Sequence, residues 1–337
     1  MRNQKHFGRI VVRTLERTAL FVLLTLLLSA LVLLGAVYVT ERGPSATAAA
    51  LFFRSAEETD VLRPAAGLFL SEEERSTCQN PTDAEETAQN VSLIHPEQSA
   101  AASSELPYLS VEDVSGSTYK GKMMIVRDAR SLLVGTADDG ETGNGARLGE
   151  LVRKYDGIAG INGGVSASDG TPRGLVIVRD TILNGNENGR YSLAGITESG
   201  VLLVGNMTGR EALENHVRWA VSYCADGAAS GALVVNGEVQ EGNLVGGLKA
   251  RTAIGQRADG SILLLVLDGG RLGSLGATRR DVCHVMLSYG AVNVAELEGG
   301  ASSAMVHRGE TVSRGNLLIP ARRVPDAFIV LREGSYE

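Results

Sequence analysis

One uncharged stretch, Thr18–Thr40, constrains this chain more than any other feature. Its 23 residues, TALFVLLTLLLSALVLLGAVYVT, are dominated by Leu and Val and contain no charged side chain. As an α-helix they would reach about 34 Å, which is enough to cross the roughly 30 Å hydrocarbon core of a bilayer. The sequence therefore predicts one transmembrane anchor at residues 18–40.

The charges on either side of this stretch predict its orientation. Residues 1–17 carry five Lys or Arg and one Glu, whereas Glu41 follows the apolar stretch. Because cytoplasmic flanks are rich in Lys and Arg, we expect a cytoplasmic N-terminal tail and an extracytoplasmic main domain. The alternative is a cleaved signal peptide, with Ala46-Thr47-Ala48 as the cleavage site. The stretch exceeds the usual apolar region of about 7–15 residues in a signal peptide, which favours a retained, single-pass anchor in the cell membrane.

The segment of residues 41–107 differs in composition from the C-terminal part of the chain. It holds twelve acidic and four basic residues and is rich in Ala, Ser and Thr. Such a composition buries too little apolar area to offset the entropy of ordering, so we expect an acidic, low-complexity stalk. One short helix is predicted inside it, because Ser71 and Glu74 have the spacing of a capping box.

Residues 108–333 have the pattern of one globular domain with many short strands. Asp259-Gly260 ahead of the apolar run Ser261–Leu267 indicates a β-hairpin. The other predicted strands are Met123–Arg127, Ser131–Val134, Ile158–Ile161, Gly174–Val178, Val201–Val204, Val221–Cys224, Ala232–Val235, Val292–Leu297 and Ala327–Leu331. Apolar spacing predicts helices at residues 147–155 and 279–289, the second beginning at Thr278 and ending at Gly290. Many strands with few helices indicate an α+β (mixed α/β) domain built on a mixed sheet.

Composition excludes several classes of function. The net charge is -7, and no basic cluster is present that would neutralise nucleic-acid phosphates, so no nucleic-acid partner is expected. The three cysteines, Cys78, Cys224 and Cys283, lack metal-ligand spacing. Cys224 and Cys283 are compatible either with a disulfide or with two separate buried thiols. We expect no metal and no cofactor.

Three segments place paired glycines and polar side chains at the ends of apolar runs. They are Ile161–Gly164, Arg251–Gln256 with the Asp268-Gly269 that ends the next run, and Glu296–Ser303. Paired glycines allow backbone to approach a ligand, and two carboxylates are the usual equipment for breaking a glycosidic bond. Each segment alone also has an ordinary interpretation, since Gly-Gly and Asp-Gly are common turns and an isolated arginine usually solvates a surface.

Taken together and in this order, the segments resemble the phosphodiester glycosidase family. The resemblance runs from about Ser117 to Leu331 and rests on INGG, on ARTAIGQRADGSILLLVLDGG, on GSLGAT, on ELEGGASSAM and on Arg322-Arg323-Val324-Pro325 before the last strand. It implies a hydrolase that cleaves a sugar-1-phosphodiester in a sugar-phosphate or phosphoglycan substrate and releases the sugar.

The resemblance also implies which residues form the site. The catalytic carboxylates would be Asp268 and Glu298, with Arg251 and Arg322 holding the phosphate. The full set of implied substrate-binding residues is Asn162, Gly163, Gly164, Arg251, Thr252, Gly299, Gly300, Ser302, Ser303 and Arg322.

The chain departs from the family pattern at several of these segments. Val165-Ser166 stands where the family has two aromatic residues, Ala250 where it has proline, Gly270 where it has arginine, and Glu296 and Glu298 where it has asparagine and aspartate. These departures leave an alternative open, in which the domain binds cell-surface glycan or serves envelope assembly without cleaving a substrate.

Overall fold

The computed structural model describes residues 2–57, 62–79, 87–101, 107–137, 145–167, 169–223, 232–244, 246–270, 273–315 and 321–335. The chain divides into two compact units, Met1–Asn80 and Pro81–Glu337. We describe each unit separately and call them the helical unit and the sheet unit.

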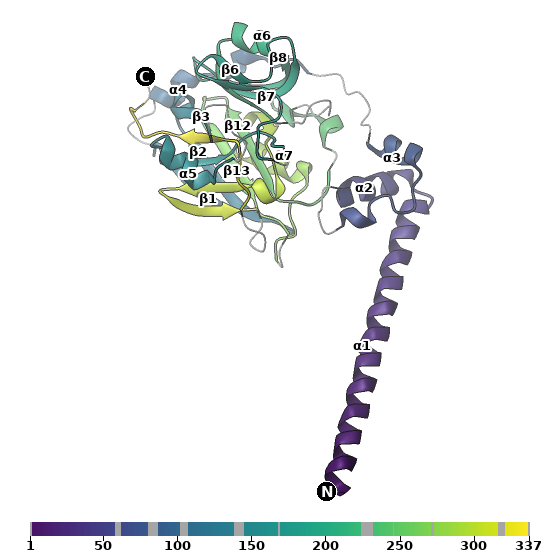
Figure 1. Ribbon diagram of the computed structural model, residues 1–337. Helices are drawn as coiled ribbons and strands as arrows, with labels where there is room; N and C mark the ends of the chain where they lie inside the picture. Colours follow the sequence, from purple (N-terminus) through teal and green to yellow (C-terminus); the bar gives the residue numbers. More distant parts are fainter. Residues whose placement is uncertain are drawn as a thin grey trace. The chain divides into compact units, whose positions relative to one another are not determined.

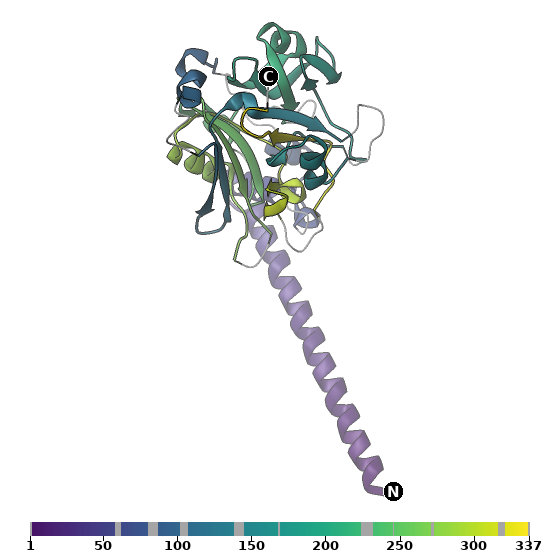
Figure 2. The same cartoon turned by 90° about the vertical axis from the view of Figure 1, so that its left-hand side faces the viewer.

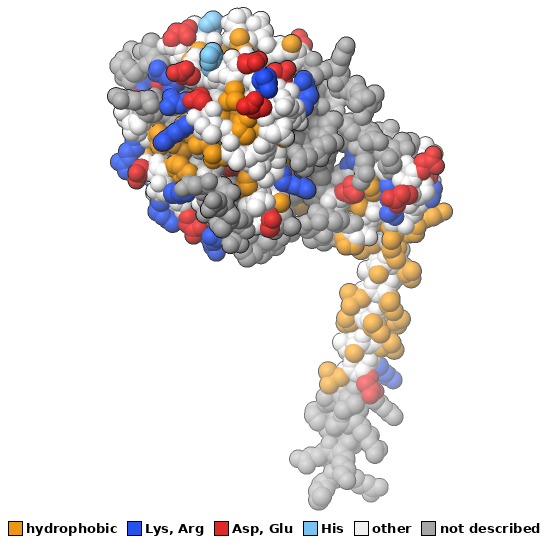
Figure 3. All heavy atoms as spheres, turned by 45° about the horizontal axis from the view of Figure 1, so that its top comes forward, with side chains coloured by type: hydrophobic (Ala, Val, Ile, Leu, Met, Phe, Trp, Pro, Cys, Tyr) orange, Lys and Arg blue, Asp and Glu red, His pale blue; other side chains and the backbone are white. Residues whose placement is uncertain are grey.

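The helical unit begins with one long helix. Helix α1 spans Arg2–Arg42. Within Thr14–Arg42 an 18-residue window has a mean hydropathy of 2.8, so this part is long and apolar enough for a membrane span or a signal sequence. Hydrophobic side chains cover the coloured part of this helix (Figure 3). The hydroxyls of Thr18, Thr25 and Thr40 each donate to the carbonyl four residues earlier, which satisfies them inside the helix.

Two shorter helices come next in the same unit: α2 (Ala46–Glu57) and α3 (Glu72–Gln79), with a 3-10 turn at Arg63–Ala65. Glu41 is buried, and its carboxylate accepts from the backbone N–H groups of Gly67 and Phe69 at 2.8 Å. The capping box predicted at Ser71 and Glu74 is confirmed, since each side chain bonds to the other's backbone N–H. The first part of the predicted stalk therefore contains packed helices; the domain boundaries themselves stay predictions.

The sheet unit contains three antiparallel sheets (Figure 1). In spatial order, the first sheet holds β1 (Leu109–Ser115), β2 (Lys120–Val126), β13 (Ile262–Leu267), β12 (Arg251–Arg257), β14 (Ala291–Glu296), β10 (Val234–Val235) and β11 (Glu238–Val239). The second holds β16 (Glu310–Arg314), β15 (Ala304–His307), β4 (Ala159–Asn162), β17 (Asp326–Val330) and β3 (Leu132–Thr136). The third holds β6 (Thr181–Asn184), β5 (Val176–Val178), β9 (Val217–Ser222), β7 (Arg190–Thr197) and β8 (Leu202–Thr208).

The sheet unit also contains short helices. They are α4 (Pro96–Ala101), α5 (Leu148–Lys154), α6 (Gly209–Glu214) and α7 (Arg279–Ser288), with 3-10 turns at Val91–Leu93, Ala129–Ser131, Glu241–Asn243 and Gly300–Ser302. One central hydrophobic cluster takes residues from all three sheets, including Leu264, Phe328 and Val221. Helix α7 packs on the first sheet (Figure 2), α5 on the second and α6 on the third.

The mixed α+β architecture expected from the sequence is confirmed. The helices predicted at 147–155 and 279–289 are α5 and α7, and the Asp259-Gly260 turn joins β12 to β13, with Gly260 at φ +93°. Strands β1, β6, β7, β11, β12, β15 and β16 were not predicted. Most of them are very short or have an apolar pattern that polar residues interrupt. The strand predicted at Val221–Cys224 falls at the end of β9, and Cys224 lies outside the described residues.

Antiparallel pairing brings the polar segments to one place. In the first sheet Arg251 lies opposite Leu267 and Ala253 opposite Glu296, so β12 begins where β13 and β14 end. In the second sheet Asn162, the last residue of β4, lies opposite Ala327 near the start of β17. The Thr252 hydroxyl donates to the Asn162 side-chain oxygen at 2.9 Å, which joins the two sheets at these ends.

Candidate active site

Asn162 holds the two sheets and the Glu298 loop together. Its side chain is fully buried; its amide nitrogen donates to the Glu298 carbonyl at 2.7 Å, and its oxygen accepts from Thr252 and from the Ala304 backbone N–H. Both ends of the amide are thus occupied by the protein itself. The geometry gives Asn162 and Thr252 the role of positioning the loop that carries Glu298.

The Gly163-Gly164 pair lies directly against Asp326. The Gly164 N–H donates to Asp326 Oδ1 at 2.6 Å, and a side chain on Gly163 would meet the same oxygen at 2.1 Å. The Asp326 carboxylate would therefore have to move if any larger residue replaced Gly163. The carbonyl of Gly163 accepts from the Glu298 N–H at 3.3 Å, so this backbone supports Glu298 and Asp326 together.

Asp326 was not predicted as a site residue. Its side chain is 1% exposed, and Oδ2 has no hydrogen-bond partner among the residues that the structure describes. Burial raises the pKa of Asp326 to about 7, against the hydrogen bond from Gly164, and the negative charge of Glu298 raises it further. A carboxyl group that is neutral below pH 7 thus lies close to the carboxylate of Glu298.

Glu298 is held in a partly open position. The Ser166 hydroxyl donates to its two carboxylate oxygens, at 3.0 and 3.1 Å, and Arg322 Nη1 lies 3.7 Å from Oε1. The side chain of Glu298 is 14% exposed and that of Arg322 is 42% exposed. Ser166, which stands where the family has an aromatic residue, therefore contacts the predicted catalytic carboxylate directly.

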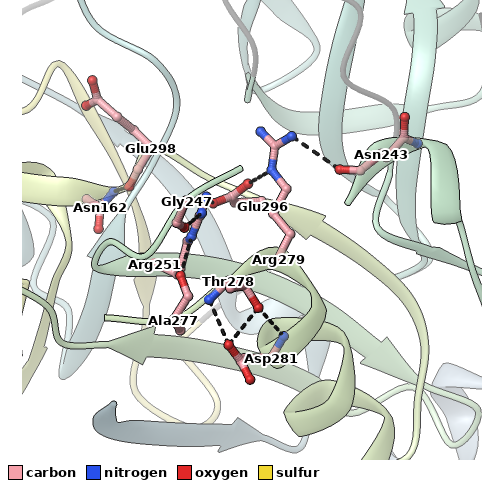
Figure 4. Close-up of polar contacts among 10 residues, drawn as sticks. All are labelled: Asn162, Asn243, Gly247, Arg251, Ala277, Thr278, Arg279, Asp281, Glu296 and Glu298. Carbon is pink, nitrogen blue, oxygen red and sulfur yellow. Dashed lines mark hydrogen bonds and ion pairs between the residues drawn. The ribbon is translucent and has the colours of Figure 1, made fainter. Parts of the chain in front are cut away.

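Glu296, only two residues earlier, belongs to a closed network. Its carboxylate forms ion pairs of 2.6 Å with both Arg251 and Arg279. Although burial works in the opposite direction, these two guanidinium groups hold the pKa of Glu296 far below its usual value. Figure 4 shows the Glu298 side chain pointing away from this network.

The Arg251 guanidinium forms its hydrogen bonds within the same network. It is fully buried, and besides Glu296 its guanidinium donates to the carbonyls of Ala277 and Gly247 (Figure 4). Arg279 adds a bond to the Asn243 carbonyl. The predicted phosphate-binding role of Arg251 has no support in this geometry, which gives it the role of holding β12, β14 and α7 together; Arg322 remains the exposed arginine beside a predicted catalytic carboxylate.

Asp268 lies in a different pocket from that network. Its Oδ1 accepts from the Ser313 hydroxyl at 2.7 Å, and it lines a cavity of about 670 Å³ together with Ser302 and Arg322. Arg322 thus borders both predicted carboxylates, contacting Glu298 and lining the Asp268 cavity. The hydroxyls of Ser302 and Ser303 are buried and have no hydrogen-bond partner in the described part of the chain.

The remaining predicted site residues are Gly299 and Gly300. A side chain on Gly299 would meet the carbonyl of Ala250 at 2.7 Å, so this glycine is required by close packing. Gly300 has φ +66° and open space beside it, and its N–H donates to the same carbonyl. These glycines shape the turn that carries Ser302 and Ser303. Gly270 ends the described part of its loop, because residues 271 and 272 lie outside it.

No cluster of His, Cys, Asp or Glu with the arrangement of a metal site occurs among the described residues. Cys283 is buried, and burial is the main cause that raises the pKa of its thiol to about 12. The possible pairing with Cys224 lies outside the described residues.

Comparison with known proteins agrees with the motif order. A sequence model described as phosphodiester glycosidase matches residues 155–331, more than half of the chain. The chain belongs to the phosphodiester glycosidase family. The match covers every predicted site residue, and it also includes Asp326 and Ser166.

Individual relatives are distant. The SPbeta prophage-derived uncharacterized protein YomE of Bacillus subtilis (strain 168) is 40% identical over 63 residues, which is 19% of this chain and 10% of that protein. The catalytic domain of zebrafish N-acetylglucosamine-1-phosphodiester alpha-N-acetylglucosaminidase, auto-inhibited by its pro-peptide, has the same fold, with a TM-score of 0.57 and 19% identity over 68% of this chain and 85% of that chain. A hypothetical protein from Synechocystis gives a TM-score of 0.49 at 17% identity, over 66% of this chain and 61% of that one.

Proposed function

We propose that this protein is a membrane-anchored hydrolase that cleaves the bond between a sugar's anomeric carbon and a phosphodiester in cell-envelope or secreted glycans. The observation that carries the proposal is the partly exposed Glu298 carboxylate beside Arg322, because Arg322 also lines the cavity that Asp268 lines. A carboxylate next to an exposed guanidinium suits a substrate whose scissile bond joins a sugar to an anion.

The reaction adds one water across the bond. Its hydroxyl joins the anomeric carbon and its proton passes to the departing phosphate oxygen, which leaves a phosphomonoester on the other product. We assign the acid–base roles to Glu298 and Asp268. One protonates the leaving oxygen as the general acid, and the other assists the attack of water. Arg322 would bind the phosphate oxygens together with the hydroxyls of Ser302 and Ser303, which have no partner among the residues that the structure describes.

Helix α1 is the segment that we propose as the membrane anchor. A helix of this length and hydropathy, with a basic tail before it, supports retention in the cell membrane with the sheet unit on the extracytoplasmic side. Accessibility of an introduced cysteine in the sheet unit to a membrane-impermeant reagent in intact cells would test this. Labelling only after lysis would contradict the orientation.

The proposal is tested with the full chain in detergent and the p-nitrophenyl phosphodiester of N-acetylglucosamine-1-phosphate. Cleavage at the anomeric carbon releases N-acetylglucosamine and p-nitrophenyl phosphate. Attack at phosphorus that expels p-nitrophenol would instead leave N-acetylglucosamine-1-phosphate, and reaction in oxygen-18 water places the label in the sugar only if the anomeric C–O bond is the one that breaks.

Two variants and one control complete this test. Glu298→Gln and Asp268→Asn are expected to lower kcat/KM by about a hundredfold or more, the usual size of an acid–base contribution. Glu238→Gln, at an exposed position on β11, should leave it unchanged. Folded protein that releases no sugar from several sugar phosphodiesters would favour the glycan-binding alternative.

A further inference from the structure

The cavity beside Asp268 has a strongly biased charge. Its volume is about 670 Å³, within the range of roughly 300–1,000 Å³ that ligand sites occupy. Six basic side chains line it, against three acidic ones. The basic residues are Lys120, Lys122, Arg147, Arg153, Arg314 and Arg322. The chain as a whole is acidic, with a net charge of -7, so this concentration of cations is local.

The acidic residues of the cavity already have partners. Asp113 pairs with Lys122 at 2.8 Å, Glu150 accepts from the Arg147 backbone N–H at 3.0 Å, and Asp268 accepts from Ser313. By contrast, the side chains of Lys120 and Arg153 are exposed and form no hydrogen bond or ion pair with any residue in the described ranges. Positive charge therefore remains available in the cavity after the internal pairs are counted.

The cavity and the proposed site share residues, since Asp268 and Arg322 line the cavity. Arg322 borders both, and the Ser302 hydroxyl, 3% exposed and without a partner among the described residues, belongs to the cavity lining. A buried hydroxyl without a partner costs free energy, which a ligand oxygen would recover. The other basic residues of the cavity are additional to Arg322 and Ser302, which we assign to the scissile phosphate, and they suit a further anionic, oxygen-rich group.

We propose that this cationic cavity binds a second phosphate of the substrate, one repeat away from the scissile bond. The preferred substrate is then a phosphate-rich glycan polymer rather than a sugar phosphodiester with a neutral aglycone. This inference rests on the proposed function, because the second phosphate is defined relative to the phosphate at the scissile bond. Binding of phosphate chains to the cavity can be measured whether or not the bond is cleaved.

The test measures binding of inorganic tripolyphosphate to the full chain in detergent by titration calorimetry, beside inorganic phosphate and an oligogalacturonate of similar charge. Tripolyphosphate should bind at least about tenfold more tightly than phosphate, and more weakly as salt is raised, because several cations contribute. Equal binding of the oligogalacturonate, or undetectable binding of tripolyphosphate, would overturn the proposal.

Variants locate the binding. Lys120→Gln with Arg153→Gln should weaken tripolyphosphate binding by about tenfold. The matched control, Arg190→Gln with Arg210→Gln, removes the same charge from exposed positions of the third sheet and α6 and should change it less than about twofold. Equal losses in both pairs would indicate a general charge effect and would reject the cavity as the site.

A variant that binds tripolyphosphate more tightly cannot be explained by misfolding, so one such variant is included. Asp113 is 86% exposed and pairs with Lys122, so Asp113→Asn releases that lysine and should tighten binding about twofold. In activity assays, a diester with an anionic aglycone should have a higher kcat/KM than its neutral counterpart, and the Lys120/Arg153 variant should reduce this preference. If no diester is cleaved while tripolyphosphate still binds with the expected salt dependence, the proposed hydrolysis fails and the anion-binding cavity stands.

Discussion

Two glutamates that are two residues apart, Glu296 and Glu298, have opposite surroundings. Glu296 is buried between Arg251 and Arg279, and each of its oxygens has an ion pair of 2.6 Å. Glu298 is partly exposed, is held by a serine, and has the Arg322 guanidinium 3.7 Å away. A fully paired charge has little left to offer a ligand, whereas a positioned but incompletely paired one does. The difference supports the structural role that we infer for Glu296 and the chemical role that we propose for Glu298.

The same contrast explains how the departures from the family pattern are accommodated. A second negative charge at position 296 would repel a phosphate if it were open to the site. Here Arg251 and Arg279 neutralise it, and Figure 4 shows the Glu298 side chain pointing away from these ion pairs. Ser166 in turn supplies hydroxyl contacts to the Glu298 carboxylate. The departures are thus compatible with an intact carboxylate site.

The largest expected effect breaks the closed network. Glu296→Gln leaves Arg251 buried without its counter-charge, which should lower the free energy of unfolding by about 3–5 kcal/mol. Chemical denaturation measures this. Glu298→Gln is the matched control and should cost less than about 1 kcal/mol, because its side chain is partly solvated. Equal losses for the two variants would contradict the division into a structural and a chemical glutamate.

Asp326 supplies the second test, through pH. Its pKa is raised to about 7 in the folded protein from an ordinary value of 3.8, so the folded state binds more protons than the unfolded state between these values. The contribution of Asp326 to the free energy of unfolding is therefore largest below about pH 4, and it is lost as the pH rises through about 7. Each pKa unit is worth about 1.4 kcal/mol, so the loss is on the order of 4 kcal/mol.

Asp326→Asn removes this ionisation and should flatten that part of the stability profile. The measurement is the free energy of unfolding of both proteins at several pH values between about 4 and 8. The free energy of unfolding of the variant should increase relative to that of the native protein as the pH rises. Parallel profiles for the two proteins would show that Asp326 does not titrate in this range.

The third test concerns Arg322, which lies beside the partly exposed Glu298. Arg322→Lys keeps the charge and loses the planar, bidentate geometry, so KM for a sugar phosphodiester should rise by about tenfold. The neighbouring Arg323→Lys is the control, since Arg323 lies 3.7 Å from Glu150 and donates to the Gly145 carbonyl rather than contacting Glu298. A similar rise in both variants would remove the special role of Arg322.

The smallest expected effect concerns Ser302. Because its buried hydroxyl has no partner among the described residues, Ser302→Ala should change stability by less than about 1 kcal/mol while raising KM a few fold. Ser313→Ala, which breaks the bond to Asp268, should instead cost about 1 kcal/mol of stability. Thermal denaturation and steady-state kinetics on both variants would check this, and a stability loss confined to Ser302→Ala would contradict it.

Much of the fold was predictable because its signals are local. The capping boxes at Ser71 and Thr278 and the Asp259-Gly260 hairpin were each read from a few adjacent residues, and each is present. Strand β12 was missed because buried Arg251 and Gln256 interrupt its apolar pattern. Their burial depends on partners about 50 residues away, Glu296 and the backbone of Leu202, which no local pattern reveals.

The sequence by itself determined the apolar helix, the mixed architecture and the order of motifs that identifies the family, because these depend on composition and short-range spacing. Only the tertiary structure separated Glu296 from Glu298, withdrew Arg251 into a buried network and brought Asp326 against the Gly163-Gly164 turn. The physical reason is that the role of a charge depends on its burial and its partners. Here antiparallel pairing brings those partners together from strands far apart in the chain.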